Sequence, residues 1–166
     1  MKTCLVGCGG IAAVHGSVLT SGIDTEFVAA ADIKPEKAQS YAENFHTKPY
    51  PSLESMLDAE KPDVLHICTP HYLHVPMTIY ALERNINVFM EKPPAISFDQ
   101  LEELKKAAAK SDAQLGFCYQ NRYNASIRAA KDLIDSGKAG KVLGARAFVT
   151  WCRGAAYYTE SGWRGS

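Results

Sequence analysis

Apolar runs and amphipathic stretches alternate along almost the whole chain. The runs KTCLVG (2–7), EFVAAAD (26–32) and DVLHICTP (63–70) are apolar nearly throughout, and stretches with helical spacing, such as PEKAQSYAENF (35–45), lie between them. Strands of this kind are typical of a parallel sheet that is covered on both faces. Strands alternating with helices of this length form right-handed βαβ units. The pattern therefore predicts an α/β fold, a Rossmann-type doubly wound parallel sheet with helices on both faces.

The remaining elements follow the same alternation until the character of the chain changes near its end. After Lys141 the predicted strand is longer than the others, and the RGAAYYTESGWRGS that follows is aromatic and glycine-rich with no helix pattern. Further strands are predicted at 48–50, 86–94, 113–120 and 141–152, and further helices at 10–20, 53–58, 72–85, 98–111 and 125–137.

Charge and cysteine usage exclude several classes of function. The chain has 166 residues, and its 18 basic residues balance its 18 acidic ones, so nothing in the charge indicates a nucleic-acid or anionic-membrane partner. No apolar run approaches the ~20 residues of a membrane span, and the first strand begins too early to leave room for a leader. The five cysteines form no CxxC pair. We therefore expect no metal site, no disulfide framework, and a reducing cytoplasm as the location.

A glycine loop joins the first predicted strand to the first predicted helix. Gly7, Gly9 and Ala12 form G-x-G-x-x-A. The first position permits a tight turn, the second lets the backbone approach a pyrophosphate, and the third lets the helix pack close to the strand. Free amide groups at the helix N-terminus attract phosphate, whereas the alternative interpretation is a plain tight turn. The loop residues predicted to bind a dinucleotide are Gly7, Cys8, Gly9, Gly10 and Ile11.

An acidic residue at the end of the second strand supports the same prediction. Asp32 lies 25 residues after Gly7, where a carboxylate accepts hydrogen bonds from the adenosine ribose. It favours NAD, although Lys34 could attract a 2′-phosphate, so NADP is not excluded. The alternative role for Asp32 is to cap the helix that begins near Pro35. S-adenosylmethionine-dependent methyltransferases also have a glycine loop and a strand-end acid, and they are the competing class at this stage.

Two further strands end in distinctive turns, ICTPHYLH and MEKPP. Ligands of open α/β sheets bind beyond the carboxyl ends of the strands. Both turns are therefore expected on the cofactor side of the sheet, which places there Thr69, Pro70, His71, His74, Glu91, Lys92 and Pro93.

Together these segments resemble the Gfo/Idh/MocA family of glucose–fructose oxidoreductases and inositol dehydrogenases. The resemblance covers GCGGIA, AAD, CTPHYLHVPMTIYALERNINVFMEKP, GFCYQNRYNAS and YYTESGWRG in order, and TP-x-x-x-H followed by EKP is its most specific part. It implies an N-terminal Rossmann domain, an α+β second domain, and oxidation or reduction of a sugar, cyclitol or related alcohol with NAD(P). The methyltransferase alternative becomes remote, because the two turns have no role in that class.

The resemblance also implies roles for individual residues. It places Lys92 near the nicotinamide and the substrate as a catalytic residue that stabilises charge on the reacting oxygen; the alternatives are a salt bridge with Glu91 or a solvated turn. His71 stands where the family often has asparagine. His74 matches a family histidine near the cofactor, and a cap of a helical turn is the alternative. The cofactor contacts implied by the turns are Thr69, Pro70, His74, Glu91 and Lys92.

The other polar candidates have less specific interpretations. His66 lies inside an apolar strand and is expected to be a core histidine, while His15 and His46 are expected to be structural or exposed. Arg122 and Tyr123 follow the sixth strand at the same edge of the sheet. They are interpreted either as contacts to substrate or cofactor or as a surface pair.

The resemblance divides the chain into a Rossmann domain over 1–120 and the start of an incomplete second domain over 121–166, a linking helix and a first strand. It implies that the chain is truncated, because the catalytic histidine of the family comes after the WRG segment. We therefore expect dinucleotide binding without useful turnover from these residues alone. The alternative is a non-catalytic nucleotide-binding module. A homo-oligomer formed through the C-terminal strand is also expected, because an unpaired apolar strand favours association.

Overall fold

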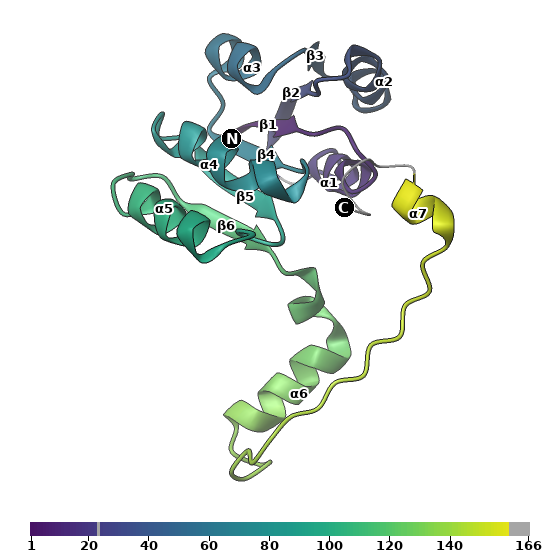
Figure 1. Ribbon diagram of the computed structural model, residues 1–166, viewed down its shortest axis with the longest axis vertical. Coiled ribbons are helices and arrows are strands. Elements are labelled where there is room, and N and C mark those ends of the chain that lie inside the picture. The colour runs from purple at the N-terminus through teal and green to yellow at the C-terminus, as the bar shows by residue number, and fades with distance from the viewer. Residues whose placement is uncertain (23, 160–166) are drawn as a thin grey trace. The chain divides into compact units, whose positions relative to one another are not determined.

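A computed structural model describes residues 1–22 and 24–159, and its first part is a six-stranded parallel sheet with the order β3-β2-β1-β4-β5-β6 (Figure 1). This is the strand order of a doubly wound dinucleotide-binding fold, so the predicted fold class is confirmed. The strands are β1 (Lys2–Val6), β2 (Glu26–Ala31), β3 (Lys48–Tyr50), β4 (Val64–Ile67), β5 (Asn87–Glu91) and β6 (Leu115–Cys118).

Helices cover both faces of this sheet. The helices α3 (Leu53–Glu60), α4 (His74–Leu82) and α5 (Phe98–Ala108) lie on one face, while α1 (Ala12–Leu19) and α2 (Pro35–Phe45) lie on the other (Figure 1). None of the helices in the described ranges has the length and apolar content that a membrane crossing requires.

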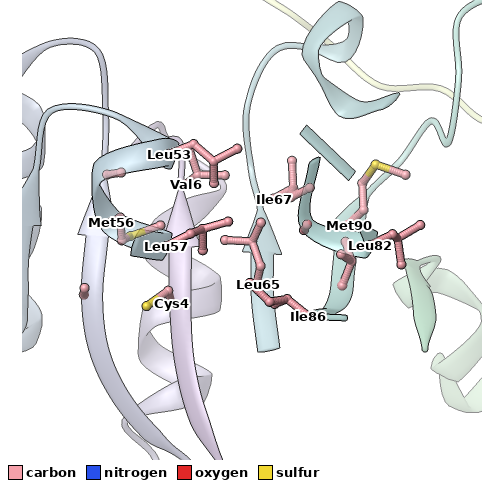
Figure 2. Close-up of a cluster of buried hydrophobic side chains, with 14 of the residues drawn as sticks. Cys4, Val6, Leu53, Met56, Leu57, Leu65, Ile67, Leu82, Ile86 and Met90 are labelled. Carbon is pink, nitrogen blue, oxygen red and sulfur yellow. The ribbon is translucent and has the colours of Figure 1, made fainter. Parts of the chain in front are cut away.

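Each face of the sheet has its own buried core. The larger core packs strand side chains against α3, α4 and α5, and Figure 2 shows Leu65 and Ile67 of β4 at its centre. A fully buried leucine such as Leu65 contributes about 1.5–3 kcal/mol relative to an exposed one. The smaller core packs α1 and α2 on the opposite face and consists of Leu5, Ala12, Ala30, Tyr41 and Cys68.

The helix boundaries follow from local capping. The Ser52 side chain accepts a hydrogen bond from the Ser55 amide at 3.1 Å, and Ser97 accepts one from the Gln100 amide at 3.2 Å, so both predicted serine caps are confirmed. α2 begins at Pro35, because proline lacks the N–H that the first turn would leave unpaired.

The chain divides into two compact units after Tyr119, next to the boundary predicted at residue 120. The second unit contains a 3-10 turn (Gln120–Tyr123), α6 (Ala125–Asp135) and α7 (Ala155–Thr159). The predicted strand at 141–152 is not present as a strand, because an apolar segment becomes one only by pairing and no described segment pairs with it. The prediction that no helix follows residue 152 is also wrong, because α7 forms there. The predicted family segment reaches residues 160–166, which lie outside the described part.

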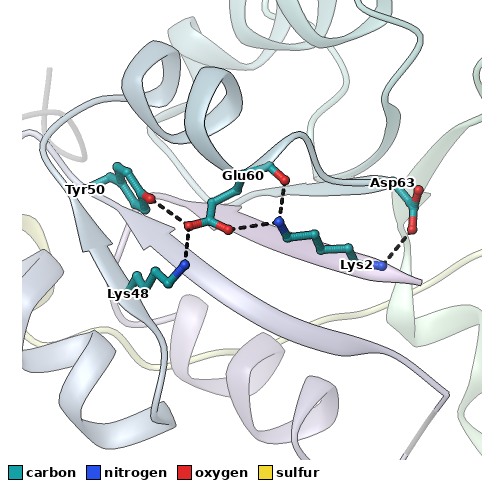
Figure 3. Close-up of polar contacts among 5 residues, drawn as sticks. All are labelled: Lys2, Lys48, Tyr50, Glu60 and Asp63. Atoms are coloured by element: carbon teal, nitrogen blue, oxygen red, sulfur yellow. Dashed lines mark hydrogen bonds and ion pairs between the residues drawn. The ribbon is translucent and has the colours of Figure 1, made fainter.

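A buried carboxylate ties three elements together at the amino edge of the sheet (Figure 3). Glu60, at the end of α3, forms ion pairs of 2.9 Å with both Lys2 and Lys48 and accepts a 2.6 Å hydrogen bond from the Tyr50 hydroxyl. These hydrogen bonds lower the pKa of Glu60 from 4.5 to about 2, and the same carboxylate raises the pKa of Tyr50 to about 12. The ionised form of Glu60 is therefore stabilised by folding.

Glu60→Gln is expected to lower the free energy of unfolding by about 1–2 kcal/mol at neutral pH, a value limited by the solvent exposure of Lys48. Because the folded-state pKa of Glu60 is depressed, its contribution is complete above about pH 5 and is lost as the pH falls toward 2. Urea unfolding at several pH values measures this difference. Glu102→Gln, at an exposed ion pair with Lys105, is the control and should change little. A gap between wild type and Glu60→Gln that stays constant down to pH 2 would contradict the assignment.

Candidate functional site

The candidate site lies at the carboxyl edge of the sheet, where β1 and β4 are neighbours. The chain leaves β1 toward β2 on one side and returns to β4 on the other, which makes this the switch point of the strand order. Ligands of doubly wound folds bind at such a point. The glycine loop follows β1, the Thr69–Pro70 turn follows β4, and the Lys92–Pro93 turn follows β5. The sheet therefore brings the three predicted motifs to one edge.

The two key glycines of the loop are required for different reasons. Gly7 has a φ of +92°, and a Cβ there would lie 2.7 Å from the carbonyl carbon of Cys68, so both its conformation and its packing exclude a side chain. A Cβ at Gly9 or Gly10 would meet nothing within 4 Å. The surface beside these two residues is open for a ligand to approach the backbone, as a pyrophosphate would.

Asp32 organises the loop from the end of β2. Its Oδ2 accepts a 2.9 Å hydrogen bond from the amide of Cys8, and its Oδ1 accepts one of 2.9 Å from the amide of Lys34. The carboxylate is partly exposed and keeps acceptor capacity for a ribose diol. Burial and the Asp32 charge raise the pKa of the Cys8 thiol to about 12, so Cys8 is a small loop residue rather than a nucleophile.

Sequence reasoning missed the role of Gly16, in the middle of α1. A Cβ on this residue would lie 2.5 Å from the hydroxyl of Tyr41, which donates a 2.8 Å hydrogen bond to the carbonyl of Ala12. Gly16 therefore lets α2 approach α1 closely and keeps the start of α1 in place behind the loop. A glycine inside an otherwise helical pattern was the available signal.

The Thr69–Pro70 turn offers one group that lacks a partner. Within the described part of the chain, the Thr69 hydroxyl is buried and forms no hydrogen bond. Buried hydroxyl groups are normally paired, so a ligand at this edge would supply the acceptor or donor that Thr69 lacks. Together with the open backbone at Gly9, this observation fits a bound dinucleotide.

His74 is directed to the backbone of two turns, and its predicted contact with the cofactor stays a prediction. The side chain is completely buried, with Nδ1 2.8 Å from the carbonyl oxygen of Pro93 and Nε2 3.0 Å from that of Thr69. Both ring nitrogens are thus engaged by backbone. His74 therefore links the Thr69–Pro70 turn to the Lys92–Pro93 turn.

Lys92 is exposed at the end of β5, and its bond to Pro93 is cis. Its neighbour Glu91 is buried and faces His15, and a contact between Glu91 and the cofactor stays a prediction. The Glu91 carboxylate lies 3.0 Å from Nε2 of His15 on α1. Among the described residues Lys92 forms no ion pair with Glu91, which leaves its ammonium group available at the edge.

The remaining histidines separate by burial. His15 is buried and bonded, and Nδ1 of His66 lies 2.9 Å from Nδ1 of His15. His66 is half-buried, and burial, with the nearby His15, lowers its pKa to about 4. His46 is exposed. Arg122 and Tyr123 belong to the second unit, so no placement relative to this edge is assigned to them.

Comparison with known proteins places these features in a family. Residues 1–119 match the Gfo/Idh/MocA oxidoreductase family with its NAD-binding Rossmann fold. D-glucoside 3-dehydrogenase of Escherichia coli K12 is 29% identical over 165 residues, which are 98% of this chain and 46% of that protein. Glucose-6-phosphate 3-dehydrogenase of Bacillus subtilis 168 is 28% identical over 142 residues, 86% of this chain and 40% of that protein.

Solved structures agree with the fold. The WlbA dehydrogenase of Chromobacterium violaceum, in complex with NADH and UDP-GlcNAcA, superposes on this chain with a TM-score of 0.91 at 31% identity. The superposition covers 100% of this chain and 48% of the WlbA chain. The chain thus spans less than half the length of these relatives. With the strand order, the glycine loop and the two turns in place, the chain belongs to the Gfo/Idh/MocA oxidoreductase family.

Proposed function

We propose that this chain forms the dinucleotide-binding and nicotinamide-side part of an NAD-dependent oxidoreductase that acts on a secondary alcohol of a sugar or cyclitol. The observation that carries the proposal is the open backbone at Gly9, which lies between the Asp32 carboxylate and the sheet edge that presents Lys92. Acid, glycine loop and lysine come from three strands of one sheet. At this common edge we assign the ribose to Asp32, the pyrophosphate to the glycine loop and the reacting oxygen to Lys92.

The chain's own residues hold the dinucleotide by backbone and charge. The amides of Gly9 and Gly10 and the N-terminus of α1 attract the pyrophosphate, and Asp32 accepts hydrogen bonds from the ribose and repels a 2′-phosphate, so NAD is preferred and NADP is the weaker ligand. Bound NAD supplies the acceptor or donor of a hydride. Lys92 Nζ hydrogen-bonds the reacting oxygen and stabilises the negative charge that develops there.

The relatives suggest the substrate class. Two of them are named 3-dehydrogenases of glucosides or glucose 6-phosphate, and another is an inositol 2-dehydrogenase from Salmonella paratyphi B. These substrates share a secondary alcohol on a six-membered ring. We take that group as the substrate class here, with a non-catalytic nucleotide-binding module as the second candidate function.

Location and assembly belong to the same proposal. None of the five cysteines, all of which lie in the described residues, forms a disulfide bond. This suits a cytoplasmic location, and cell fractionation tests it. The segment 142–151 suits an interface between copies of the chain, because it exposes apolar side chains. These are Val142, Leu143, Phe148, Val149 and Trp151.

The two loop glycines predict opposite outcomes. Gly9→Val should fold normally, because nothing of the protein lies within 4 Å of its Cβ, yet it should abolish NADH binding by filling the pyrophosphate position. Gly7→Val should lower the free energy of unfolding by at least about 1–3 kcal/mol, because the φ is positive and the side chain meets the Cys68 backbone. Calorimetric titration and urea unfolding measure the two effects. Equal NADH affinity in wild type and Gly9→Val would refute the proposed cradle.

The activity is tested by NADH absorbance with methyl glucoside, glucose 6-phosphate and myo-inositol, using the 166-residue chain and any longer polypeptide that its reading frame encodes. Saturable NADH binding is expected from the 166 residues, and turnover from the polypeptide that includes substrate-binding residues. Lys92→Ala should lower kcat about 10²–10⁴-fold. NADH binding without turnover in every form would favour the non-catalytic module, and tighter binding of NADPH than of NADH would contradict the role of Asp32.

Self-association is expected through 142–151. Light scattering of the purified chain should give a mass above that of one copy, and a Phe148→Glu, Val149→Glu double variant should shift the chain toward monomer, because buried charge without a partner opposes association. Glu102→Gln is the control and should leave the mass unchanged. A monomer at every concentration of the wild type would exclude this interface.

A further inference from the structure

Four ionisable side chains meet behind the Lys92 turn, and the proposed chemistry uses none of them directly. His15 comes from α1, His66 from β4, Glu91 from β5 and Cys118 from β6. His15 Nε2 lies 3.0 Å from Glu91 Oε1, His15 Nδ1 lies 2.9 Å from His66 Nδ1, and Cys118 hydrogen-bonds the same carboxylate. The side chains of His15 and Glu91 are each only 6% exposed. Polar groups so deep in a fold are costly unless they hold a defined arrangement.

The hydrogen bonds run in one direction. A carboxylate only accepts, so His15 Nε2 carries the proton that faces Glu91. His66 is neutral above about pH 5, because burial and His15 lower its pKa to about 4, and it therefore has a single ring N–H. With its ring proton on Nε2, His15 presents a lone pair at Nδ1, so the Nδ1–H of His66 donates to it and the His15 ring keeps one orientation. The ring is also packed against Phe89, 5.9 Å between centroids, which limits its rotation.

The carboxylate at the end of this chain stays ionised. Burial opposes ionisation of Glu91, but the hydrogen bonds from His15 and Cys118 and the charge of Lys92 outweigh it, so the pKa lies below its ordinary value. Glu91 is the last residue of β5 and Lys92 follows it directly. Fixing the side chain of Glu91 therefore fixes the backbone from which the lysine projects.

The same atoms could be considered as metal ligands. Ligand atoms of His15, Glu91 and Cys118 lie within 4.8 Å of one another. The direct contacts of 3.0 Å and 2.9 Å already give each ring nitrogen of His15 a partner. Hydrogen bonding therefore explains the arrangement without an ion, and a metal becomes an outcome of the test.

The cluster connects two parts of the proposed machinery. α1 carries the proposed pyrophosphate-binding N-terminus, and β5 ends directly before Lys92. The two elements are far apart in sequence, and β1, which leads into α1, is separated from β5 by β4 in the sheet. We propose that His15, held by His66 and bonded to Glu91, is a positioning residue that fixes the Lys92 turn relative to the helix that binds the dinucleotide. The inference rests on the proposed function, because it takes Lys92 as the residue beside the nicotinamide.

The test measures how well NADH shields Lys92 from an amine-acylating reagent, read at this residue by peptide mass spectrometry. Each protein is labelled at an NADH concentration ten times its own Kd. At this concentration about a tenth of the protein is free of NADH, so a lysine that NADH covers is labelled at about a tenth of its rate without NADH. Wild type should show this tenfold protection. His15→Leu should lose most of it while still binding NADH. His15→Gln, whose amide can donate to Glu91, should restore part. His46→Asn changes an exposed histidine with a left-handed backbone and is the matched control with full protection.

His66→Phe provides a second route if His15→Leu does not fold, because a ring of similar size replaces His66 beside Phe89 and only the hydrogen bond to His15 is lost. Reduced protection at normal NADH binding supports the inference. Full protection in folded His15→Leu or His66→Phe overturns it and leaves the proposed function intact. No protection of Lys92 in wild type that binds NADH overturns the placement of Lys92 in the proposed function, and the inference with it. One equivalent of zinc that survives chelation and is lost in Cys118→Ser replaces the inference with a metal site.

Discussion

The close approach of Gly7 to the backbone of Cys68 determines how β1 and β4 end at the carboxyl edge of the sheet. Because a Cβ at Gly7 would lie 2.7 Å from the Cys68 carbonyl carbon, β1 and β4 can end side by side only with glycine at this position. The Gly7 amide bonds the carbonyl of Ala31 at 2.8 Å, and the Cys68 amide bonds that of Val6 at 2.8 Å. These two hydrogen bonds join the carboxyl ends of β1, β2 and β4 at the point where the glycine loop begins. Two residues further along the loop, a Cβ at Gly9 would meet nothing within 4 Å, so the backbone there is open.

Much of this arrangement could be predicted from the sequence, because it depends on local rules. Continuous apolar strands, serine caps and Pro35 at a helix start are each determined by a few neighbouring residues. The segment 141–152 failed for the opposite reason: its apolar pattern is strand-like, but a strand exists only with a partner, and pattern alone does not supply one. The short helix Ala155–Thr159 lacks the length that makes a helical period detectable.

The site was predicted at the level of motifs and less well at the level of side-chain direction. The glycines, Asp32 and the turn of Lys92 meet at one edge because parallel strands place their carboxyl ends together. Sequence could not reveal that Glu91 turns away toward His15, since that pairing joins residues 76 positions apart. Nor could it show that both nitrogens of His74 are engaged by backbone carbonyls. Such facts depend on packing between elements, not on spacing along the chain.

Glu91 and Lys92 are neighbours in the chain, but the first is buried and the second is exposed. Glu91 is buried, and its carboxylate is hydrogen-bonded by His15 and Cys118; the charge of Lys92 also favours the ionised form, although the two residues form no ion pair in the described part of the chain. If the lysine instead neutralised Glu91, its ammonium would be drawn to the buried side and away from the edge. The hydrogen bond from His15 on α1 thus holds the Glu91 carboxylate on the buried side, while Lys92 is exposed. His15 also belongs to α1, whose N-terminus we propose to bind the pyrophosphate, so its hydrogen bond to Glu91 links that helix to the Lys92 turn.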